Sequence, residues 1–129
     1  MKRKFVLIVL ALVLAFGAVS VVNAKVTSAS VAADRTSNTS ASTSASANFD
    51  GIKDSVKCTI TLQEKYNGSW RTATGLSKTS VSKTKTDTTV ILLSSKFTLK
   101  KGKVYRIKAK FTDKKGSRTT SSTYYSGSF

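Results

Sequence analysis

Among the side chains that could bind or react with a partner, this 129-residue sequence is richest in cations, the side chains of lysine and arginine. Between Lys96 and Arg118 it has ten lysines and arginines and a single acid. Within that segment Arg106, Lys108 and Lys110 share one parity, so a β-strand would hold them in a row, about 7 Å apart. Such a row suits repeated contact with an anionic surface. It equally suits a soluble protein whose exposed strands carry lysine to avoid aggregation.

Side chains for catalysis or metal binding are sparse. The sequence has no histidine, the commonest general base, nucleophile activator and metal ligand. Cys58 falls on the apolar parity of its segment and is interpreted as a small buried hydrophobe. Asp50-Gly51 and Asp54 offer too few oxygens for calcium and are interpreted as a turn that caps its own backbone. We therefore expect no enzymatic activity, no metal site and no cofactor.

Aromatic side chains could supply one further kind of chemistry, stacking against the rings of a carbohydrate. Most of them share parity with apolar neighbours, so packing is the favoured interpretation. Trp70 and the adjacent pair Tyr124 and Tyr125 are the exceptions that we single out for testing.

Residues 1–24 are predicted to be a secretory signal peptide. Three basic residues precede an apolar run from Phe5 to Phe16, and Val22-Asn23-Ala24 provides a signal peptidase site. We predict cleavage between Ala24 and Lys25 and a secreted, extracellular protein. The alternative is an anchor in the membrane by residues 5–22, a length within the lower range for a spanning helix.

Loss of this segment would leave a small and strongly basic domain. The whole chain has 22 Lys and Arg against 6 Asp and Glu, a formal charge of +16, and removing the three cations of the leader leaves +13. A charge of this size steers a protein towards anionic partners. The length allows one domain, and Cys58, the only cysteine, cannot close an intramolecular disulfide. We expect a monomer.

The strand pattern starts after a Ser and Thr rich stretch. Residues 25–40 are interpreted as a loose tail or a weak edge strand, and residues 41–129 as the folded domain. From Ala41 to Phe49, small apolar and polar residues alternate with strand period. The clearest alternation follows, with Val56, Cys58, Ile60, Leu62 and Tyr66 on one side of a strand and Lys57, Thr59, Thr61, Gln63 and Lys65 on the other.

Turn signals divide the rest of the chain into short strands. Asn67-Gly68 predicts a hairpin whose returning strand, Ser69 to Thr74, is anchored by Trp70. Leu76 to Thr89 is polar and predicts a long connection or a weak edge strand, followed by a short strand at Val90 to Leu93. The remaining elements are a turn at Leu99 to Lys103, a strand that turns Tyr105, Ile107, Ala109 and Phe111 to one side, a hairpin turn at Asp113 to Gly116 and a strand at Arg118 to Tyr125.

Several short strands without helical periodicity predict an all-β protein, a small antiparallel sandwich. The stretch from Leu99 to Tyr105 resembles the corner between strands E and F of fibronectin type III and immunoglobulin-like domains, in which the tyrosine hydroxyl bonds to the backbone upstream. The stretch from Leu62 to Trp70 resembles the C to C′ hairpin of small bacterial immunoglobulin-like modules. With its leader, the chain resembles an uncharacterised family of short exported proteins of Gram-positive bacteria, and the resemblance implies an immunoglobulin-like fold without an assigned activity.

In such a fold the strand with Lys57 and Lys65 would pair with the strand of Arg106, Lys108 and Lys110. These five cations then form a candidate binding face. The first hypothesis is a secreted surface-association module that holds anionic cell-wall or membrane-surface polymers such as teichoic acids or lipid headgroups. The alternative is a secreted toxin or bacteriocin-like effector, although no amphipathic helix is apparent. Nucleic acid is an unlikely partner, because no recognition motif is present.

Overall fold

The computed structural model describes residues 26–129, which form six strands and no helix. The predicted signal peptide, its cleavage site at Ala24 and Lys25, and the alternative anchor at residues 5–22 lie outside the described residues. Among residues 26–129 no helix is long and apolar enough to cross a membrane. The strands are β2 (Val26–Ser37), β3 (Ser40–Tyr66), β4 (Ser69–Thr72), β5 (Ser80–Thr98), β6 (Tyr105–Lys115) and β7 (Arg118–Tyr125).

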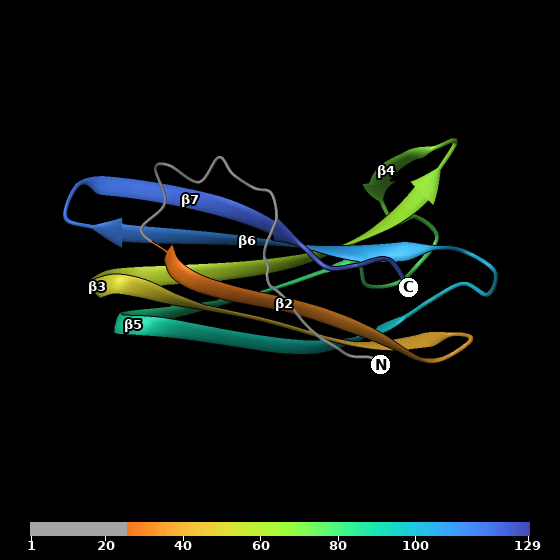
Figure 1. Cartoon of the computed structure of the whole chain (residues 1–129), viewed down its shortest axis with the longest axis horizontal. Helices are drawn as coiled ribbons and strands as arrows, with labels where there is room; N and C mark the ends of the chain where they lie inside the picture. Colours follow the sequence, from red (N-terminus) through yellow and green to blue (C-terminus); the bar gives the residue numbers. More distant parts are fainter. Residues whose placement is uncertain (1–25) are drawn as a thin grey trace.

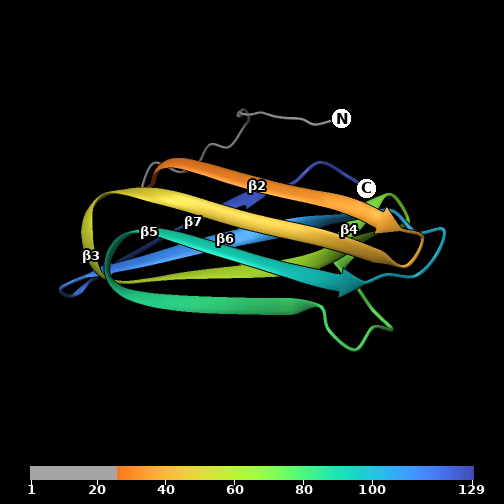
Figure 2. The ribbon, with the colours of Figure 1, turned by 90° about the horizontal axis from the view of Figure 1, so that it is seen from below.

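All pairings are antiparallel and belong to one sheet, which folds over into two facing layers (Figures 1 and 2). In one layer, the first half of β3 lies between β2 and the second half of β5. In the other layer, the second half of β3 lies between the first half of β5 and β6, and β7 continues the layer beyond β6. The predicted all-β, antiparallel, sandwich-like fold is therefore confirmed.

The two layers share β3 and β5, because both strands bend and run through both of them (Figure 2). The bend lies where the register between β3 and β5 shifts, between Asn48 and Lys53. Opposite this shift, Asp87 adopts a positive φ of 51°, a conformation that Asp tolerates better than most residues do. We call this end of the molecule the bend end and the opposite end, near Tyr105, the corner end.

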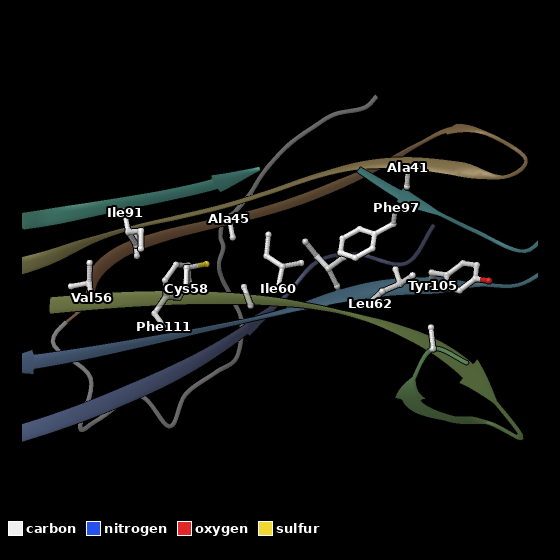
Figure 3. Packing of buried hydrophobic residues seen from close by; sticks show 14 of the residues in the cluster. Ala41, Ala45, Val56, Cys58, Ile60, Leu62, Ile91, Phe97, Tyr105 and Phe111 are labelled. Atoms are coloured by element: carbon white, nitrogen blue, oxygen red, sulfur yellow. The ribbon is translucent and has the colours of Figure 1, made fainter. Parts of the chain in front are cut away.

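The core lies between the layers, and the inward positions of its strands have the predicted parity (Figure 3). Val56, Cys58, Ile60 and Leu62 of β3 are fully buried, as are the four predicted inward residues of β6. The opposing layer contributes small residues from β3, among them Ala41, Ala45 and Ala47, and the larger Ile91 and Phe97 from β5. Small side chains facing large ones fill the space between layers without voids.

Both turns that determine the register of the second layer are as the sequence predicts. Asn67 and Gly68 have φ values of 51° and 80°, as a two-residue turn with two left-handed positions requires. The Tyr105 hydroxyl accepts a hydrogen bond of 2.9 Å from the backbone N–H of Lys100. This is the upstream backbone bond that the resemblance to the E to F corner implies, and Leu99 and Tyr105 are both buried beside it.

Several sequence predictions were wrong in the extent of the elements. Residues 50–54 belong to the continuous strand β3 rather than to a turn that caps its own backbone, since Asp50 pairs with Lys53 and Asp54 accepts from the N–H of Gly116. The segment predicted as a long connection or a weak edge strand is an edge strand from Ser80 onward, and it continues without a break through the predicted short strand at Val90 to Leu93 as β5. β4 ends at Thr72, and Tyr66 is half exposed beyond the edge of the core.

The Ser and Thr rich residues before Ala41 form an edge strand in the structure. β2 pairs with the first half of β3 from Val26 opposite Phe49 to Ser37 opposite Ser40. Its inward residues Ala29, Val31 and Ala33 pack against the core cluster. Residues 26–129 therefore share one continuous sheet.

Candidate functional site

The outward side of the layer built from β5, β3, β6 and β7 gathers the cations that the sequence singled out. Lys57 and Lys65 lie on β3, and the register places Gln63 of the same strand opposite Arg106 and Thr61 opposite Lys108. Lys110 follows opposite Thr59. All five predicted residues therefore point outward from one layer. Lys57, Lys65 and Lys110 are exposed, and Arg106 and Lys108 are partly buried.

The sequence analysis missed a sixth cation on this side, Lys114, which lies opposite Ser55. Its parity, the same as that of Lys108 and Lys110, is the signal that could have identified it. We call this side the basic face and define its cations as Lys57, Lys65, Arg106, Lys108, Lys110 and Lys114.

The cations of the basic face are interleaved with hydroxyl and amide side chains. No cation lies directly opposite another in the β3–β6 register, because Lys57, Arg106, Lys108, Lys110 and Lys114 each have Ser, Thr or Gln as a partner, while Lys65 lies opposite Trp70 of β4. On the other side of β6, Lys110 lies opposite Thr123 and Lys114 opposite Thr119. Like charges directly opposite one another destabilise a sheet. The interleaving therefore lets the face hold a high positive charge while offering hydrogen-bonding groups between the cations.

No carboxylate lies at the outward positions of this layer within residues 53–129. Two of the six acids, Glu64 and Asp113, lie on the inward side of the same strands and are buried. Each has the parity of a core neighbour, Leu62 or Phe111, which is a signal of burial that the sequence analysis did not use. The prediction that Asp113 lies in a hairpin turn was wrong, because β6 continues to Lys115.

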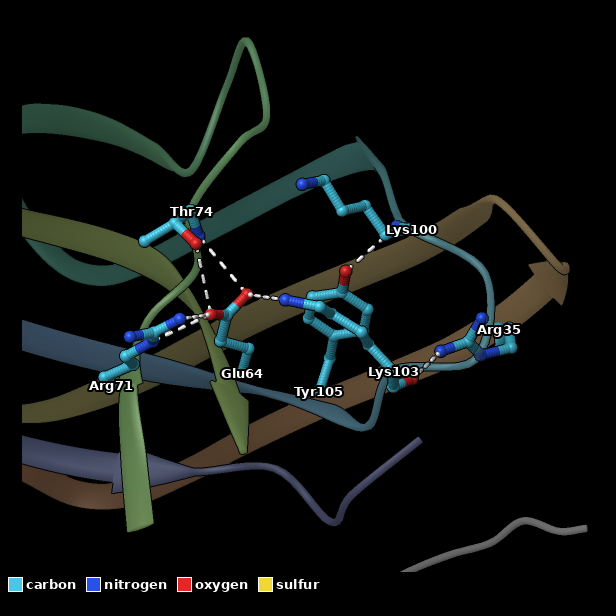
Figure 4. A network of polar contacts seen from close by, with 7 residues as sticks. All are labelled: Arg35, Glu64, Arg71, Thr74, Lys100, Lys103 and Tyr105. Atoms are coloured by element: carbon cyan, nitrogen blue, oxygen red, sulfur yellow. Dashed lines mark hydrogen bonds and ion pairs between the residues drawn. The ribbon is translucent and has the colours of Figure 1, made fainter. Parts of the chain in front are cut away.

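Glu64 is the centre of a polar network at the corner end (Figure 4). Its carboxylate accepts from Arg71 at 2.7 to 2.8 Å, from Lys103 at 3.3 Å and from both the N–H and the hydroxyl of Thr74. Burial by itself would raise the pKa of Glu64, but these donors outweigh it and lower the pKa to about 2. The network ties β4 and the turn before β6 to the end of β3.

Lys53 is the corresponding centre at the bend end. Its side chain is 8% exposed, and its ammonium lies 2.7 Å from Asp50 and 3.5 Å from Asp113. The hydrogen bond to Asp50 raises the pKa of Lys53 and, with the charge of Asp113, outweighs the effect of burial. Asp113 also accepts from the hydroxyl of Thr120 on β7. The two buried acids, Glu64 and Asp113, therefore pair with cations that are not part of the basic face. The positive charge of the basic face is not neutralised by them.

The three aromatic residues singled out for testing, Trp70, Tyr124 and Tyr125, lie in two different environments. Tyr124 is partly buried and packs edge-on against Phe111, with ring centroids 5.9 Å apart. Trp70 and Tyr125 instead lie on the basic face, where both rings contact the guanidinium of Arg106, at 4.6 Å and 4.1 Å from its Cζ. Trp70 is therefore not a core anchor of its hairpin, and its ring is partly covered by a cation.

Cys58 lies in the core between the layers, opposite Phe111. Burial raises the pKa of its thiol to about 11. We expect an aromatic disulfide reagent at pH 8 to modify the native protein at least about 100-fold more slowly than the denatured chain, because little thiolate forms and the sulfur is covered. The appearance of the released thiolate chromophore measures both rates. Equal rates would contradict the buried position.

No family model, curated protein or solved structure matches this chain.

Proposed function

We propose that this is a secreted surface-association protein that holds anionic polymers of the cell envelope through the basic face. The observation that carries the proposal is the segregation of charge across one layer. Six cations of β3 and β6 point outward, and the two buried acids of these strands, Glu64 and Asp113, point inward, each paired with a cation outside the basic face. Lysines that served solubility alone would be expected to mix with acids on the same surface.

The arrangement favours an extended ligand over a compact one. From Arg106 to Lys114 the cations follow β6 for roughly 27 Å, given the rise per residue of a strand, and Lys57 and Lys65 widen this row on the neighbouring strand. A polymer with repeated anionic groups can contact several of these cations at once. Hydroxyl side chains between the cations, such as Thr59, Thr61 and Thr112, can hydrogen-bond to a polyol or sugar backbone.

The test compares two variants with the same change in net charge. In the face variant, Lys57, Lys65, Arg106, Lys108 and Lys110 are replaced by Gln. In the control, Lys85, Lys96, Lys101, Lys115 and Arg118, which lie outside the basic face, are replaced by Gln. Retention of each mature protein on purified cell walls is then measured by sedimentation.

We expect the face variant to bind at least about tenfold more weakly than the control. Raising the salt from about 0.01 M to about 1 M shortens the Debye length from roughly 30 Å to roughly 3 Å and should release the wild-type protein. Thermal unfolding of both variants verifies that they fold. Retention that ignores salt, or equal retention of the two variants, would overturn the proposal.

A further inference from the structure

Within residues 26–129, three arginines have guanidinium groups over aromatic rings, and they differ in what their terminal nitrogens bind. Arg71 lies 3.6 Å from the centroid of Tyr66 and pairs with Glu64. Arg35 lies 5.7 Å from the centroid of Tyr105 and donates to the backbone carbonyls of Asn38 and Lys103. Both are occupied by the protein itself.

Arg106 is different. Its Nε donates to Oε1 of Gln63 at 2.7 Å, but no acceptor within residues 26–129 forms a hydrogen bond or ion pair with either terminal nitrogen. In the described part of the chain no acid lies on the same face to pair with it. The Arg106 guanidinium is therefore a planar set of donors that the protein holds in place. Unlike the guanidinium of Arg71, which pairs with Glu64, it has no anionic partner within residues 26–129.

Three strands hold this guanidinium in a defined orientation. The rings of Trp70 on β4 and Tyr125 on β7 contact the guanidinium, and Gln63 of β3 accepts a hydrogen bond from its Nε. Partial burial lowers the pKa of Arg106, against a smaller opposing effect of Tyr125, yet an arginine stays charged at neutral pH. Because the side chain is already ordered, binding an anion would cost less conformational entropy here than at a free surface arginine.

Two lysines add charge beside the stack. The Lys65 ammonium lies 5.5 Å from the centroid of the same Trp70 ring, so it lies within about 10 Å of the Arg106 guanidinium, a bound that follows from the two ring distances. Lys108 follows Arg106 on the outward side of β6 and lies opposite Tyr125. A fork of N–H donors with lysines on neighbouring outward positions matches the oxygens and the charge of a phosphate.

We infer that Arg106, with Lys65 and Lys108, forms a phosphate-binding site, and that it takes the phosphodiester groups of an envelope polymer. The inference rests on the proposed function and deepens it, because it distinguishes one specific subsite from the general charge of the basic face. A planar donor pair selects the geometry of the anion, whereas the other cations of the face are lysines, which act as point charges.

The probe for the test is a short, soluble oligomer of glycerol phosphate. Trp70 is the only tryptophan of the chain and touches Arg106, so its fluorescence reports on occupancy of this site. Calorimetry measures the affinity independently of the fluorophore. The two variants compared are Arg106→Lys and Arg118→Lys, which make the same chemical change, the second at the β6–β7 turn of the bend end.

We expect the oligomer to change Trp70 emission saturably in the wild type and in Arg118→Lys. The affinity of Arg106→Lys should fall about tenfold although its charge is kept, because the fork and its stacking are lost. Vesicles containing phosphatidylglycerol form a second arm. Sensitivity to Arg106→Lys with the oligomer supports a polymer phosphodiester, and sensitivity only with vesicles assigns the site to a lipid phosphate instead.

Equal affinities of Arg106→Lys and Arg118→Lys for both probes would overturn the inference. Poly-glutamate that binds as tightly as the oligomer, with the same sensitivity to Arg106→Lys, would overturn the assignment to phosphate. Neither result bears on the proposed function, which fails if retention on cell walls ignores salt or if the five-residue face variant is retained as strongly as its control. The two failures are thus distinguishable.

Discussion

Replacing Arg71 and Lys103 together by Gln should destabilise the protein by about 3 kcal/mol at pH 7, because it leaves the buried carboxylate of Glu64 without its cations. Burial would then dominate and raise the pKa of Glu64 above its ordinary value of 4.5. A raised pKa in the folded state gives stability at low pH that is lost as the pH rises. Denaturant unfolding between about pH 2 and pH 7 measures this dependence.

In the wild type, the titration of Glu64 should make the free energy of unfolding rise with pH, the opposite of the dependence expected for the double variant. With a folded pKa of about 2 against 4.5, Glu64 contributes stability above pH 4.5 that disappears as the pH falls towards 2. Glu64→Gln is the reference, because it removes this titration and should cost only about 1–2 kcal/mol. Its cost is smaller since Arg71 and Lys103 are 41% and 36% exposed and can be hydrated. Identical slopes in the wild type and the double variant would contradict the network.

Phe97→Ala should have the largest effect of any truncation on β5, about 3–5 kcal/mol, or a fall in Tm of more than about 10 °C. Phe97 is 2% exposed and projects from one layer into the space between the two (Figure 3). Calorimetric unfolding measures the change.

Leu92→Ala is the matched control for this prediction. Leu92 lies on the same strand, but its side chain is 56% exposed on the outer side. Truncation there should change the unfolding free energy by about 0.5 kcal/mol or less. Equal losses of unfolding free energy in Phe97→Ala and Leu92→Ala would contradict the burial of Phe97 between the layers.

The strands with a strong alternation could be predicted from the sequence, and those with polar residues on both sides could not. The second half of β3 and β6 each bury one side and expose the other, so their parity is visible in the chain, whereas β7 was predicted from the turn that precedes it. The first half of β5 is an edge that pairs only with β3, and Lys83 and Lys85 have its inward parity although both are exposed. Such lysines protect an edge from pairing with another chain, and they remove the alternation that predicts a strand.

The candidate site was predictable to a similar degree. Parity alone placed Arg106, Lys108 and Lys110 in a row, and the expected pairing with the strand of Lys57 and Lys65 placed all five on one side. The contacts that distinguish Arg106 depend on the cross-strand register, which aligns Gln63 with Arg106 and Lys108 with Tyr125. No local pattern in the sequence encodes this alignment. The ion pairs of Lys53 with Asp113 and of Glu64 with Lys103 also join residues that lie far apart in the chain.

The directions of β2 and β7 determine how the fold would respond to mechanical tension. β2 runs from the bend end towards the corner end, and β7 runs the same way from Arg118 to Tyr125. Tension applied between Val26 and Tyr125 would therefore pull along the strands and at right angles to their hydrogen bonds. The bonds of β2 to β3 and of β7 to β6 would share the load instead of opening one after another. Such shear geometry would let the domain keep its structure under a tension between its two ends that would open a hairpin pulled from one end.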